Sequence, residues 1–167
     1  FQRIVITLAL GCVDDHRRIS GVQEHEVEDQ PRHLPAVLGE GVDLEKLSTQ
    51  DVTWRDVEVE ELGFLNFSRY VKKENRTDVI LARTLIKSEK AGTIRLKMGY
   101  SDRIDLFLNG RKVFAAESHF RKRDQTFLGV LGPFDTLYLE LEPGENQLTA
   151  MVSERFGGWG IMGIIEK

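Results

Sequence analysis

Hydrophobic and polar residues alternate along most of the second half of this chain. Every second residue is mostly apolar in six segments: Ile80 to Ile86, Ile94 to Tyr100, Ile104 to Leu108, Leu137 to Leu141, Leu148 to Val152 and Trp159 to Ile165. A period of two places successive side chains on opposite faces of a strand, so that one face can line a core. Turn-forming residues separate the segments, as in antiparallel folds. The pattern predicts an all-β domain, an antiparallel β-sandwich or jelly roll.

Asn109 and Gly110 connect two of these segments, SDRIDLFL and RKVF. Asn-Gly favours a two-residue type I′ turn, because both turn positions need a positive φ. That turn sets the register of the hairpin, which is predicted to have one buried face. The predicted cross-strand pairs are Leu106 with Val113, Ile104 with Ala115, Asp105 with Phe114, and Phe107 with Lys112.

The first third of the chain has weaker patterns. The apolar run IVITLALG before Cys12 is predicted to be a strand; the alternative is the end of a lipoprotein signal, in which such a run precedes a lipidated cysteine. Residues 19–27 are expected to form a short strand, and prolines and glycines make residues 28–50 irregular. We expect one domain over residues 1–167, with an irregular N-terminal part (1–50) that holds one or two strands and a core sandwich (54–167).

Composition narrows the possible partners. The 167 residues carry 23 basic and 27 acidic side chains, a net charge of -4, which argues against nucleic acid because phosphate binding needs a positive face. A single cysteine cannot form an internal disulfide. No apolar run approaches the roughly 20 residues of a membrane-spanning helix. We therefore expect no nucleic-acid partner and no transmembrane span.

The sequence carries little that indicates catalysis. His16, His25, His33 and His119 lack the close spacing of a zinc site. Acidic residues are frequent, as at Glu58, Glu60 and Glu61, but a glycosidase needs two carboxylates held facing each other across a cleft. An exposed acidic strand edge explains them more simply. We expect that the domain is not an enzyme.

Three segments, in this order, carry a family resemblance: FLNG (Phe107 to Gly110), PGENQL (Pro143 to Leu148) and SERFGGWG (Ser153 to Gly160). Together they resemble the galactose-binding-like jelly rolls, β-sandwich modules attached to many glycoside hydrolases. The resemblance covers roughly residues 79–165. It implies a non-catalytic carbohydrate-binding module, commonly secreted or periplasmic and often tethered to a catalytic domain. Such modules often carry a structural calcium ion near the sheet edge; no other cofactor is expected.

Two loops are predicted to hold the sugar, because ligand-binding loops gather at one end of a sandwich. They span Ser118 to Asp124 and Glu154 to Gly160. The candidate residues are Arg121, Arg123 and Asp124 for hydroxyl groups, and Phe120, Phe156 and Trp159 for the apolar face of the ring. The alternatives are a solvated loop for the basic cluster, and core packing for Trp159 and for Trp54.

Two further alternatives concern the start of the hairpin and the function as a whole. Asp102 and Asp105 are oxygen donors suited to calcium, although no linear calcium-binding loop is present. Asp102 and Arg103 are alternatively an ion pair across the turn.

The competing function is a structural or protein-interaction domain that packs against a neighbouring domain and binds no sugar.

Overall fold

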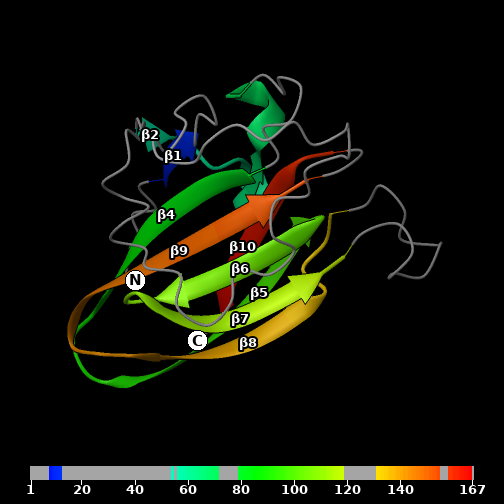
Figure 1. Ribbon diagram of the computed structural model, residues 1–167. Coiled ribbons are helices and arrows are strands. Elements are labelled where there is room, and N and C mark those ends of the chain that lie inside the picture. Colours follow the sequence, from blue (N-terminus) through cyan, green and yellow to red (C-terminus); the bar gives the residue numbers. More distant parts are fainter. Residues whose placement is uncertain are drawn as a thin grey trace, which may run out of the picture.

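Two antiparallel β-sheets pack face to face in the computed structural model, which describes residues 8–12, 54, 56–71, 79–118, 131–154 and 158–166 (Figure 1). The six-stranded sheet has the spatial order β2 (Asp56–Val57), β1 (Leu8–Cys12), β4 (Val79–Ser88), β9 (Gly144–Ser153), β6 (Arg103–Leu108), β7 (Arg111–Glu117). The four-stranded sheet has the order β3 (Phe64–Asn66), β10 (Gly160–Glu166), β5 (Gly92–Ser101), β8 (Asp135–Leu141). The predicted antiparallel β-sandwich is confirmed.

The main core lies between the two sheets and is made by the residues that the alternation places on one face. Burial of these side chains is the chief stabilising term of the fold. The six-stranded sheet contributes Ile80, Ala82, Ile86, Ile104, Leu106, Leu108, Leu148, Ala150 and Val152, and the four-stranded sheet contributes Leu65, Leu96, Met98, Tyr100, Leu139 and Leu141. Leu8–Cys12 forms strand β1, paired with β2 and β4.

The six-stranded sheet is buried on both faces at its centre, whereas one buried face was expected for the hairpin. On the side away from the other sheet, Leu81, Phe107 and Met151 form a second buried cluster, against which Trp54 and Val79 pack. Asp105 lies on this same side and is also buried. The expectation was wrong because polar and charged residues occupy positions between the apolar ones, which makes a central strand resemble an amphipathic one.

The hairpin has a β-bulge that the sequence prediction lacks. Asn109 and Gly110 have φ values of 50° and 80°, as the predicted turn requires, and Phe107 pairs with Lys112. Beyond that pair the register shifts by one residue. The observed partners are Leu106 with Phe114, Asp105 with Ala115, and Ile104 with Ala116, so the other three predicted pairs are wrong. The bulge lets two consecutive apolar residues, Val113 and Phe114, both contact the main core.

The register of the strands gives the sandwich two different ends. At one, the turn end, tight connections join β4 to β5, β6 to β7 and β8 to β9. At the other, the loop end, β5 passes directly into β6, β7 and β9 finish, and β10 begins. Both loops that are predicted from the sequence to bind a ligand leave the sandwich at the loop end.

Candidate functional site

The loop end is organised around the corner between β5 and β6, residues 100–102. The hydroxyl of Ser118, the residue after β7, donates to the backbone oxygen of Tyr100 at 2.7 Å, and its backbone N–H donates to the oxygen of Asp102. The N–H of Asp102 donates to the oxygen of Ser153, the last residue of β9, at 2.7 Å. The starting points of the two predicted loops are therefore fastened to one corner.

A buried carboxylate strengthens this arrangement. Glu154, which follows β9, has only 1% of its surface exposed, and its Oε2 accepts a hydrogen bond from the Ser101 hydroxyl at 2.9 Å. A buried carboxylate is costly unless hydrogen bonds or charges compensate it, so its partners are held in defined positions. Glu154 lies too deep to contact a ligand directly. Its role in this geometry is to position the backbone from which the second loop departs.

Most of the predicted ligand-binding residues lie outside the described part of the chain. These are Phe120, Arg121, Arg123 and Asp124 in the first loop, and Phe156 in the second. Trp159 is described: its side chain is 3% exposed, and its ring packs edge to face against Phe67, with centroids 6.0 Å apart and an interplanar angle of 83°. The indole therefore sits in the core, as the alternative interpretation proposed, and offers no open ring face here.

Trp54 is likewise a packing residue. It contacts the second buried cluster of Leu81, Phe107 and Met151, and the Arg83 guanidinium lies 4.4 Å from the centre of its ring. A guanidinium over an indole face is a favourable cation–π contact. That face is occupied by a protein cation, so the packing interpretation of Trp54 is the one that the contacts support.

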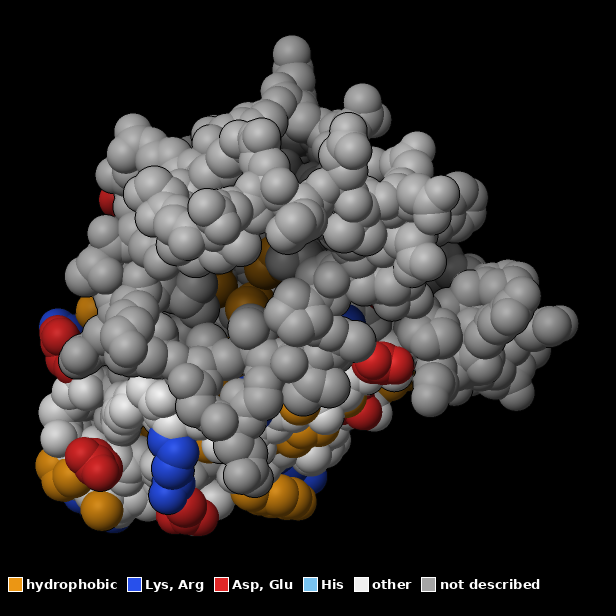
Figure 2. Space-filling view, in the orientation of Figure 1, with side chains coloured by type: hydrophobic (Ala, Val, Ile, Leu, Met, Phe, Trp, Pro, Cys, Tyr) orange, Lys and Arg blue, Asp and Glu red, His pale blue; other side chains and the backbone are white. Residues whose placement is uncertain are grey.

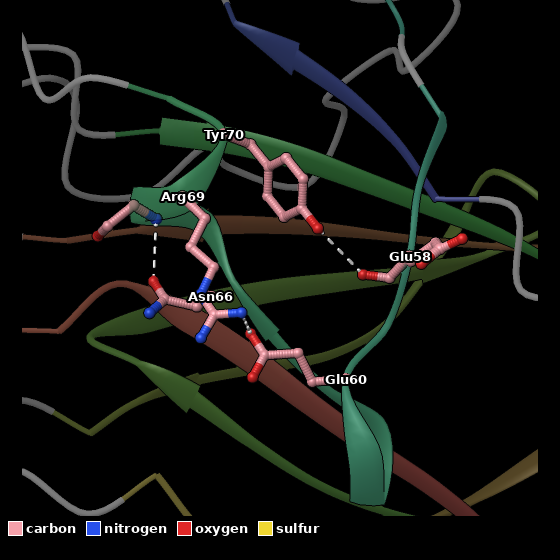
Figure 3. Close-up of polar contacts among 6 residues, drawn as sticks. Glu58, Glu60, Asn66, Arg69 and Tyr70 are labelled. Atoms are coloured by element: carbon pink, nitrogen blue, oxygen red, sulfur yellow. Dashed lines mark hydrogen bonds and ion pairs between the residues drawn. The ribbon is translucent and has the colours of Figure 1, made fainter.

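The acidic residues near position 60 have separate partners or face solvent. Glu60 forms an ion pair with Arg69 at 2.9 Å, and Glu58 accepts a hydrogen bond from the Tyr70 hydroxyl through its backbone oxygen at 3.2 Å (Figure 3). The side chains of Glu58 and Glu61 are exposed. These contacts hold residues 58–70 as the link between the two sheets.

The described residues do not provide a metal site. No group of three or more His, Cys, Asp or Glu side chains among them is placed to hold a metal ion. Asp105, one of the two candidate calcium donors, instead pairs with Lys112 at 2.9 Å and with Arg103 at 3.6 Å. Arg103 also reaches Glu117, at 3.6 Å. In the described part of the chain, no helix is long and apolar enough to cross a membrane.

Sequence reasoning missed the outer face of the four-stranded sheet, which faces away from the core. Tyr138 on β8 is 68% exposed, and Phe134, just before β8, is 46% exposed. On the neighbouring strands, Arg95 and Lys97 both contact the carboxylate of Glu166. The alternation of β8 already placed Tyr138 outward between Leu137 and Leu139, and this was the available signal.

Charge on the described part of the visible face is mixed in sign. Figure 2 shows acidic and basic side chains interspersed with hydrophobic ones on the coloured part of the face turned toward the viewer. An apolar cavity of about 90 Å³ lies between the two sheets, lined by residues such as Ala82, Leu96, Met98 and Ile161. The described residues lining it are almost all apolar.

Comparison with known proteins gives matches only among solved structures. No family model matches the chain, and no curated protein matches it. A β-glucosidase from Kluyveromyces marxianus in complex with glucose aligns with 63% of this chain at 12% identity and a TM-score of 0.46. A family 31 α-xylosidase from Xanthomonas citri aligns with 66% at 13% identity and a TM-score of 0.42. The chain covers only 13% and 12% of those two chains.

Proposed function

We propose that this domain is a non-catalytic carbohydrate-binding module, an accessory domain of a larger extracytoplasmic protein. The resemblance of FLNG, PGENQL and SERFGGWG to galactose-binding-like jelly rolls motivates the proposal, and the β-sandwich fold is compatible with it. The observation that carries it is the fastening of Ser118 and Ser153 to the corner formed by residues 100–102. This brings the origins of both candidate loops to one end of a rigid frame, where binding loops are usual.

The chemistry assigned to the loops is that of sugar recognition. Arg121, Arg123 and Asp124 supply planar groups that donate or accept hydrogen bonds in pairs, which suits neighbouring hydroxyls. Phe120 and Phe156 supply apolar ring faces. Trp159 is left out of the ligand contacts because its ring is buried against Phe67.

A binding experiment with matched variants tests this proposal. The purified domain is applied to a glycan array, with calcium and again with a chelator. Arg121→Ala and Phe156→Ala are expected to weaken binding about tenfold or more, as central binding residues do. Lys90→Ala removes an exposed cation at the turn end and is expected to leave binding unchanged. If Arg121→Ala and Phe156→Ala bind glycans as tightly as the wild type and Lys90→Ala do, the loop end is not the binding site.

The second candidate is a structural or protein-interaction domain without a sugar ligand. Leu62 favours it, because this large apolar side chain is 76% exposed in the 3₁₀ turn before β3. A large exposed apolar side chain is a suitable contact for a partner protein. A folded domain that binds no glycan in either condition, and whose parent protein loses stability when Leu62 is changed to Asp, would favour this second candidate.

A further inference from the structure

The outer face of the four-stranded sheet presents aromatic and planar polar groups together. The register places Glu166, Arg95 and Tyr138 side by side in one row across β10, β5 and β8. The next row toward the loop end contains Ile164, Lys97 and Thr136. In the row on the other side, the Thr93 hydroxyl donates to the Glu140 carboxylate at 2.7 Å. The face thus combines one exposed ring with a set of polar groups.

A second ring lies on the same face near the beginning of β8. A side chain at Gly99 on β5 would point away from the core. The backbone oxygen of Gly132 lies where the Cβ of that side chain would be. The ring of Phe134 in turn lies over Gly132, with its Cζ 2.6 Å from an ideal Cβ position there. The two glycines therefore let the chain cross the face closely, with the Phe134 ring packed on Gly132 and 46% of this residue exposed. Phe134 directly precedes β8 and is four positions from Tyr138, which corresponds to roughly 13 Å between their Cα atoms at ~3.3 Å per residue of strand.

The polar groups between these rings are fixed by one another. The Glu166 carboxylate lies between Lys97, at 2.8 Å, and Arg95. The hydrogen bond from Lys97, and then the contact with Arg95, hold the pKa of Glu166 below its ordinary value. The carboxylate therefore stays ionised, and the guanidinium keeps a defined orientation beside Tyr138. Such preorganisation reduces the entropy lost when a ligand binds.

The charges on this face favour a neutral ligand. Arg95 and Lys97 are balanced by Glu166 and Glu140, so the described part of the face carries two charges of each sign. A ligand with apolar faces and many hydroxyls matches rings flanked by groups that both donate and accept. Phe134 and Tyr138 stand four positions apart along the chain, so their backbone positions are farther apart than the width of one sugar ring, which favours an extended chain as the ligand.

We propose that this outer face is a second carbohydrate-binding surface, which takes a neutral, extended polysaccharide lying along β8. Phe134 and Tyr138 contact two separate sugar rings, and Arg95 and Glu166 bind hydroxyls beside Tyr138. The inference rests on the proposed function for its ligand class, but it uses none of the loop-end residues. The two surfaces would give the domain two points of attachment to one polymer, which raises the overall affinity.

Affinity electrophoresis tests this surface. The domain is run through gels that contain hydroxyethylcellulose, galactomannan, soluble starch or the anionic polymer alginate. We expect retardation in at least one neutral polymer and none in alginate. Tyr138→Ala and Phe134→Ala should each reduce that affinity about tenfold, while Tyr138→Phe should remain within about threefold of wild type because the ring is retained.

A matched control and the loop-end variant separate the two proposals. Leu62→Ala removes a still more exposed apolar side chain, in the 3₁₀ turn before β3, which the proposed surface does not use, and should change nothing. If Arg121→Ala loses binding while Tyr138→Ala and Phe134→Ala bind every polymer as wild type does, the sheet-face site is wrong and the proposed function stands. If the folded wild-type domain binds none of the polymers and no glycan on the array, both are wrong.

Discussion

The side-chain amide of Asn109 donates a hydrogen bond to Oδ1 of Asn146, with 3.0 Å between the two atoms. Asn109 belongs to the FLNG turn and Asn146 to the PGEN turn, so two separate sequence motifs meet in space. Asn109 also bonds to Gln147 twice, through its backbone N–H and through its Oδ1, both at 2.8 Å. The two asparagines therefore join the turn of the β6–β7 hairpin to the beginning of β9.

Asn146 is predicted to be essential for stability. It is fully buried; its Oδ1 accepts from the Glu142 N–H at 2.9 Å, and its Nδ2 donates to the Glu142 oxygen at 2.8 Å. Asn146→Ala should lower the free energy of unfolding by about 2–4 kcal/mol, because several buried polar groups lose their partners together. Urea denaturation measures this. Asn66→Ala, which removes a single exposed side-chain bond to Ser68, should cost less than about 1 kcal/mol; equal losses in the two variants would contradict the account.

The crossing at Gly99 is predicted to tolerate no side chain. Gly99→Ala places a methyl group against the backbone of Gly132, which cannot move aside as a flexible side chain would. We expect a loss of about 1–3 kcal/mol. Gly92→Ala on the same strand meets no atom within 4 Å and should be neutral or slightly stabilising. The two melting temperatures give the comparison, and similar values would show that the crossing is looser than described.

Replacing Leu62 by asparagine is predicted to relieve strain in the backbone. Its φ of 62° and ψ of 18° lie in the left-handed region, which is unfavourable for an aliphatic side chain. Because the side chain is largely exposed, replacing it loses little packing. Leu62→Asn should therefore raise the free energy of unfolding by about 0.5–1 kcal/mol, whereas Leu62→Ala keeps the strain and should change it little. Thermal denaturation of both variants decides; a destabilised Leu62→Asn protein would mean that the side chain makes a contact that matters.

Glu166 is predicted to make the stability of the fold sensitive to acid. Its pKa is lowered first by the hydrogen bond from Lys97 and further by Arg95. A carboxyl group whose pKa is lower in the folded state stabilises the fold above its unfolded-state pKa, and this contribution is lost as the pH falls through the folded-state pKa. Between about pH 5 and pH 3 the wild type should lose more stability than Glu166→Gln. Melting curves across this interval test the sign, and parallel curves would contradict it.

The strands from residue 79 onward follow from their alternation, and the type I′ turn follows from Asn109 and Gly110. The bulge at Val113 does not, because it depends on both Val113 and Phe114 reaching the core, which is a property of tertiary packing. The burial of Phe107 and Asp105 on the second face likewise depends on Trp54 and on the cations Lys112 and Arg103, which are distant or ambiguous in sequence.

The candidate site could likewise be predicted from the sequence only in part. The sequence identifies the two loops by their aromatic and charged residues, but only the register shows that both begin at the corner of residues 100–102. In the sequence, Trp159 resembles a sugar-stacking residue. In the structure it is a core residue, because Phe67, 92 positions earlier in the chain, packs against its ring. The sheet face depends on pairing across β10, β5 and β8, which no single segment contains.

Carbohydrate binding by the wild-type domain is the central claim, and a glycan and polysaccharide array on the folded protein tests it most directly. We predict selective retention of neutral glycans, weakened by Arg121→Ala at the loop end and by Tyr138→Ala on the sheet face, with Lys90→Ala unchanged. A blank array from a folded sample, both with calcium and with a chelator, would contradict the account and identify the domain as a structural or protein-interaction module.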